Sequence, residues 1–140
     1  MEKSKLNLKK IHETAPKAFE FFLKWSHSGR TAEDFFKMSD SPELRDRGIN
    51  DRELFTFFDQ QELYIEIDLC FNDVQMGWNW RVFWDMPKEE GQENLAPVKL
   101  AKSGSESDYH LQREDAECGA FEQAFEELEY KIVNGNFRKV

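Results

Sequence analysis

Cysteine is scarce in this sequence, and the cysteines present are not spaced for metal binding. Cys70 and Cys118 are the only two among 140 residues, and no Cys-x-x-Cys pair or zinc-type Cys/His spacing occurs. We therefore expect neither a disulfide framework nor structural zinc. Neither cysteine lies in a run of basic residues that would activate its thiol, so both are expected to be inert packing groups.

Long hydrophobic runs are also missing. No segment approaches the ~18 apolar residues that a membrane-spanning helix needs. The first residues, MEKSKLNLKKIHE, lack the apolar centre of a secretory signal. Together with the low cysteine content, these features predict a cytoplasmic protein in a thiol-reducing compartment, with no membrane association.

The sequence contains none of the common catalytic or cofactor motifs. There is no glycine-rich phosphate loop, H-E-x-x-H, G-x-S-x-G or EF-hand loop. The three histidines, His12, His27 and His110, are far apart, and each is expected to be an ordinary residue. No catalytic residue, metal or cofactor is predicted, and whether the protein is an enzyme stays open, with a non-enzymatic role favoured.

Charge is abundant and mostly negative. The formal net charge is −9, whereas four lysines and one glutamate give residues 1–12 a charge of +3. The rest of the chain therefore carries −12, which repels phosphate backbones and disfavours nucleic-acid partners. Residues 1–12 are predicted to be a flexible basic tail, because chain ends often fray.

Aromatic residues supply a core for one domain. Thirteen Phe and four Trp can each bury ~150–250 Å², and the length suits a single globular domain, predicted here to span residues 13–140. Helices dominate the first sixty residues. Thr14 is the expected N-cap of a helix with Pro16 in its first turn, and its apolar face consists of Phe19, Phe21, Phe22, Leu23 and Trp25.

Further helix-start patterns follow along the chain. They occur at Thr31, at Ser41-Pro42 and at Asn50 with Glu53. The last of these opens a helix whose apolar side is Leu54, Phe57 and Phe58.

The period of the hydrophobic pattern changes to two after Gln61. Residues 63–71 alternate without a break and predict a strand, and residues 78–84 predict a second strand that pairs with it antiparallel. Short strands are also predicted at 97–101 and 108–112. A helix over about 119–133 has an apolar stripe of helical spacing and ends at Gly135.

This order of elements predicts an α+β fold. Helices come first, then an antiparallel β-meander of two to four strands, then a C-terminal amphipathic helix packed on one sheet face. The aromatic strand W-x-W-x-V-x-W and the closing helix, read as AFEQAFEELEYKIVNG, resemble small uncharacterised proteins of phages, prophages and bacterial mobile elements. The resemblance covers about residues 62–135 and implies no catalytic residue.

Two groups of residues in the predicted hairpin are candidates for function. Glu66, Asp68, Arg81 and Asp85 can meet on its polar face and hold Mg²⁺ through oxygens, although cross-strand neutralisation by Arg81 explains the same pattern. Trp78, Trp80 and Trp84 share the other face. They are expected to be core, or to expose one end of the stripe, especially Trp78, as an anchor for a partner protein.

Three hypotheses for function follow. The first is a non-enzymatic binding or accessory module with a protein partner, carried on a phage or mobile element. The second is a metal-dependent hydrolase that uses the hairpin carboxylates. The third is an acidic inhibitor that imitates DNA through two runs of glutamates. These runs are Glu89, Glu90 and Glu93, and Glu122, Glu126, Glu127 and Glu129.

Overall fold

The computed structural model confirms the α+β class. It describes residues 6–26, 31, 33, 51–71, 76–84, 90–91, 99–103 and 112–137. In chain order the elements are α1 (Leu8–Thr14), α2 (Pro16–Trp25), α5 (Asp51–Gln60), β1 (Leu63–Phe71), β2 (Met76–Trp84), β3 (Lys99–Ser103) and α6 (Arg113–Asn134). The predictions at Ser41-Pro42, Asn50, His27, Asp85 and 108–111 lie outside the described residues.

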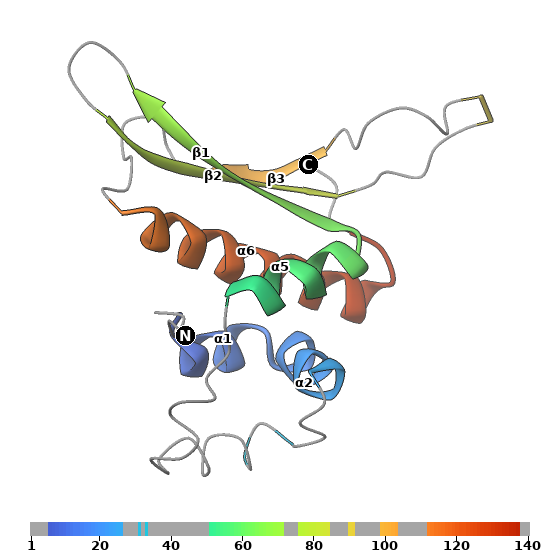
Figure 1. Ribbon diagram of the computed structural model, residues 1–140. Helices are drawn as coiled ribbons and strands as arrows, with labels where there is room; N and C mark the ends of the chain where they lie inside the picture. Colours follow the sequence, from blue (N-terminus) through green and yellow to red (C-terminus); the bar gives the residue numbers. More distant parts are fainter. Residues whose placement is uncertain are drawn as a thin grey trace.

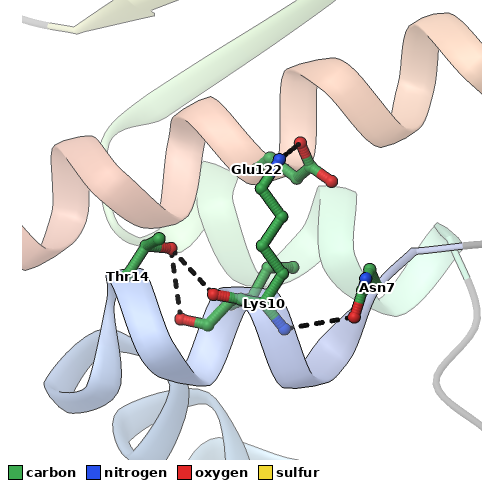
Figure 2. A network of polar contacts seen from close by, with 5 residues as sticks. Asn7, Lys10, Thr14 and Glu122 are labelled. Carbon is green, nitrogen blue, oxygen red and sulfur yellow. Dashed lines mark hydrogen bonds and ion pairs between the residues drawn. The ribbon is translucent and has the colours of Figure 1, made fainter.

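The N-terminal segment is not a free arm over its described part. Residues 8–14 form α1, with Asn7 as N-cap: its side-chain oxygen accepts a hydrogen bond from the Lys10 backbone N–H at 3.1 Å (Figure 2). Leu6 and Ile11 are buried in the core. The predicted flexible tail is therefore wrong for residues 6–12, because the two apolar side chains fix the segment to the body.

The predicted cap at Thr14 is also wrong. Thr14 is the last residue of α1, and its hydroxyl donates to the backbone oxygens of Lys10 and Ile11 at 3.1 and 3.4 Å (Figure 2). The N-cap of α2 is Ala15, which offers no side-chain hydrogen bond, although Pro16 does occupy the first turn. A threonine hydroxyl can bond back to the preceding turn as readily as forward to the next helix.

The elements form three layers, as Figure 1 shows: the sheet, then α5 and α6, then α1 and α2. Phenylalanine rings join the two helical layers. Phe22 of α2 meets Phe57 of α5 edge-on at 5.0 Å and Phe125 of α6 at 6.0 Å between ring centroids. Phe21 is 42 % exposed, so the apolar face of α2 is narrower than predicted.

The sheet has the strand order β1-β2-β3 in the described part of the chain, with both pairings antiparallel. β1 matches its predicted range, and β2 begins two residues before its predicted start. In the β1–β2 ladder Leu63 pairs with Trp84, and Phe71 pairs with Met76. β3 lies two residues later than predicted, and the register shifts between Val82 and Phe83.

α6 packs on the sheet as predicted, but it is longer and more buried than expected. It begins at Arg113, with Glu114 and Asp115 in its first turn, where carboxylates favour the positive end of the helix dipole. It ends at Gly135, which adopts a left-handed conformation with φ of 83°. With the sheet on one side and α1 and α2 on the other, α6 is the central element (Figure 1). No helix in the described residues is long and apolar enough to cross a membrane.

Candidate functional site

The tryptophan stripe of β2 belongs mostly to the core. Trp84 is 1 % and Trp80 is 7 % exposed, so neither can be the partner-binding residue that the sequence suggested. Trp78 is half-buried, packs against the core and lies under the guanidinium of Arg113, 5.4 Å from the ring centroid. The stripe is core because α6 follows β2 along this face.

Coverage of this sheet face falls steadily along the β1–β2 ladder. Leu63 and its partner Trp84 are fully buried, whereas Leu69 at the other end is 47 % exposed. The last pair, Phe71 and Met76, is 76 % and 64 % exposed. We call Leu69, Phe71 and Met76 the open end of the hairpin.

The open end lies beyond the cover of the helices. In Figure 1 the end of the hairpin where β1 finishes and β2 begins rises away from α6. Adjacent strands in a sheet are rotated by about 20–25°, so a nearly straight helix cannot follow a two-strand ribbon along its whole length. The exposed side chains are on the same face as the buried ones, because residues i and i+2 of a strand point the same way.

The predicted carboxylate group is partly assembled on the opposite face. Glu66 pairs with Arg81 across the strands and forms an ion pair at 3.6 Å, with both side chains 46 % exposed. Asp68 lies opposite Asn79. A hydrogen bond with Asp68 is the main cause that raises the pKa of Glu66; burial and the charge of Asp68 add to it, and Arg81 opposes it.

This arrangement favours cross-strand neutralisation over metal binding. Arg81 occupies the position where a cation would balance Glu66. Among the described residues there is no group of three or more His, Cys, Asp or Glu side chains that could hold a metal ion. Asp85, the remaining member of the predicted group, lies outside them.

The glutamates of α6 are largely engaged inside the fold. Glu122 forms an ion pair with Lys10 of α1 at 3.3 Å (Figure 2). Glu129 accepts a hydrogen bond from the backbone N–H of Ala18 at 2.8 Å. Glu127 is 2 % exposed and accepts from Gln123 at 2.7 Å. These three carboxylates do not form the open acidic surface that an imitation of DNA needs.

The described residues include both cysteines and one histidine, His12. Cys70 and Cys118 are both half-buried, and Cys118 packs against the core. The ring of His12 lies 5.9 Å from that of Phe19 between centroids.

The open end was not predicted from the sequence. The alternation placed Leu69 and Phe71 in the strand over 63–71, and the second strand was expected to begin at residue 78, after Met76. A signal was present in the sequence, because the apolar alternation of β1 continues up to Phe71, directly before the polar residues Asn72 and Asp73. Comparison with known proteins adds no further constraint: no family model, curated protein or solved structure matches the chain.

Proposed function

We propose that this protein is a non-enzymatic binding module that contacts a protein partner through the open end of the hairpin. The observation that carries the proposal is the exposure of three large apolar side chains, Leu69, Phe71 and Met76, next to each other on one sheet face. Adjacent exposed apolar residues mark interaction surfaces more often than single ones do. The half-buried Trp78 borders this surface as the cross-strand partner of Leu69.

The composition of the open end suits an interface core. Methionine adapts its shape to a partner, and aromatic residues contribute large contact areas there. Charged side chains lie nearby: Arg113 stands over Trp78 on this face, and the Glu66–Arg81 pair lies on the opposite face. The partner class is therefore protein, and we retain an origin on a phage or mobile element as part of the proposal.

A capture experiment with matched variants tests this function. The wild-type protein, the double variant Phe71→Ser/Met76→Ser and the control Ile132→Ser/Val133→Ser are immobilised and exposed to lysate from the native cell. The control residues are also exposed and apolar, but they lie near the end of α6. We expect a specific protein to bind the wild type and the control and to be lost from the Phe71/Met76 variant.

The salt dependence separates this surface from an acidic one. Binding through apolar side chains should survive an increase in salt, because apolar burial is not screened. Equal capture by all three proteins, or capture that disappears in high salt, would show that the open end is not the contact surface.

A further inference from the structure

Among the described residues, no strand lies along the outer edge of β1, next to the open end. Within the described strands, β1 pairs with β2 on one side and has no strand on the other. It is nine residues long, from Leu63 to Phe71. An exposed strand edge is a template for an extended segment of another chain, which adds its backbone hydrogen bonds to the sheet.

The two faces of β1 require different side chains from an added strand. On one face, Leu69 and Phe71 are exposed and apolar. On the other face, Glu66 and Asp68 provide two carboxylates, and β2 provides the one guanidinium of Arg81. Asp68 lies opposite the uncharged Asn79, so this face of the ladder has an excess of one negative charge.

We propose that the edge of β1 binds an extended segment of a partner protein in which basic and apolar residues alternate. The inference rests on the proposed function and specifies the partner. Successive residues of the added strand would face opposite sides of the sheet. Lys or Arg would stand beside Glu66 and Asp68, and apolar side chains would stand beside Leu69 and Phe71.

The electrostatics of the edge favour this partner over a second copy of the chain. Two β1 strands paired antiparallel around their middle would bring Glu66 and Asp68 of one copy beside the same carboxylates of the other. Like charges directly opposite each other destabilise a strand pair, whereas opposite charges stabilise it. Within one chain, the hydrogen bond with Asp68 is the main cause that raises the pKa of Glu66, and burial and the charge of Asp68 add to it.

The test uses two synthetic nine-residue peptides of equal composition. One alternates lysine and valine, and the other has the same residues in an order with helical spacing. Both are labelled, and their binding to the full-length protein is measured by fluorescence anisotropy. We expect the alternating peptide to bind at least about tenfold more tightly, because only its order matches both faces of a strand.

Charge reversal at the edge sharpens the test. Asp68→Lys should weaken the binding of the alternating lysine–valine peptide about three- to tenfold, and it should allow a glutamate–valine peptide to bind. Glu13→Lys changes the net charge equally on an exposed position of α1 and should have no effect. If circular dichroism shows that Asp68→Lys is unfolded, Asp68→Asn serves instead, with a smaller loss in the same direction.

Four outcomes would overturn the inference. Equal affinity for the two lysine peptides would indicate unspecific attraction to an acidic protein. An equal loss of peptide affinity in Asp68→Lys and Glu13→Lys would also indicate attraction to the net charge alone. A chain that elutes as a dimer dependent on β1 would show that a second copy occupies the edge. If the alternating peptide fails while the Phe71/Met76-dependent capture succeeds, the edge inference is wrong and the proposed function stands.

Discussion

The two ends of the β1–β2 ladder have similar residues and opposite environments. At one end Leu63 and Trp84 are buried, and Trp84 stacks on Phe137 at 5.8 Å between ring centroids. At the other end Phe71 and Met76 are exposed. Both pairs are large and apolar and are on the same sheet face. Alternation therefore decides which face of the sheet a side chain is on, whereas the neighbouring layer decides whether that face is covered.

The largest expected difference comes from truncating one aromatic residue at each end. Trp84→Ala should lower the free energy of unfolding by about 3–5 kcal/mol, because it leaves a cavity in the core. Phe71→Ala should change it by less than about 0.5 kcal/mol, because the side chain is exposed. Urea unfolding of both variants measures the difference, and similar losses at the two positions would refute the contrast between the ends.

The middle of the ladder depends on the close approach of α6. A Cβ added at Gly119 would lie 2.7 Å from Nε1 of Trp80. Gly119→Ala should therefore destabilise the fold by about 1 kcal/mol, because overpacking costs about 1–3 kcal/mol and the gain in helix propensity returns about 1 kcal/mol. The effect should diminish in a Trp80→Phe background, since the smaller ring removes the indole nitrogen. A double-mutant cycle by thermal unfolding checks this, and additive effects would contradict the close approach.

The carboxylate of Glu129 in α6 joins the two helical layers at the start of α2. Ala15 gives α2 no side-chain cap, and Glu129 of α6 accepts from the Ala18 backbone N–H instead. Glu129→Gln should cost about 0.5–1 kcal/mol, since it keeps a hydrogen-bond acceptor but loses the charge near the positive end of the helix. Glu126→Gln, one turn earlier on α6 and also half-buried, is the control. Equal losses in the two variants would show that the cap contributes nothing.

The strands and the fold class could be predicted because their signals are local. The alternation from Leu63 to Phe71 needs no knowledge of the rest of the chain, and it gave the bounds of β1 correctly. The aromatic stripe of β2 and the apolar stripe of α6 were equally clear. An antiparallel hairpin followed from the short connection between two strands.

The open end and the α6 contacts could not be predicted because they depend on the packing of layers. The glutamates of α6 gave a candidate acidic surface in the sequence, yet α1 and α2 pack beside them, so Glu122 pairs with Lys10 and Glu129 accepts from Ala18. Likewise, the twist that lifts Phe71 away from α6 is a property of the assembled sheet. The sequence allowed two interpretations of Glu66 and Arg81, a cross-strand ion pair or part of a metal site. The register places the two residues opposite each other, which favours the ion pair.

The smallest expected effect concerns the stability contributed by Glu66 and Asp68, on the opposite face of the hairpin from the open end. The hydrogen bond and charge of Asp68 raise the pKa of Glu66 above its ordinary value near 4.5. The folded protein therefore holds this proton more tightly than the unfolded chain does, so the stabilisation is full below the ordinary pKa and is lost as pH rises through the raised pKa. The energy involved is small, because half of the side chain is exposed and screened by solvent.

Two substitutions should move the titration of Glu66 in opposite directions. Asp68→Asn removes the main cause of the shift, so the pKa of Glu66 should fall towards its ordinary value. Arg81→Gln removes the cation that opposes the shift, so the pKa should rise further. Both pKa changes are measured by NMR of the Glu66 carboxyl carbon from about pH 3 to about pH 7, the range in which carboxylates titrate. If the pKa of Glu66 is unchanged in Asp68→Asn, the two carboxylates do not interact, and the edge of β1 has no carboxylate pair for a basic strand to neutralise.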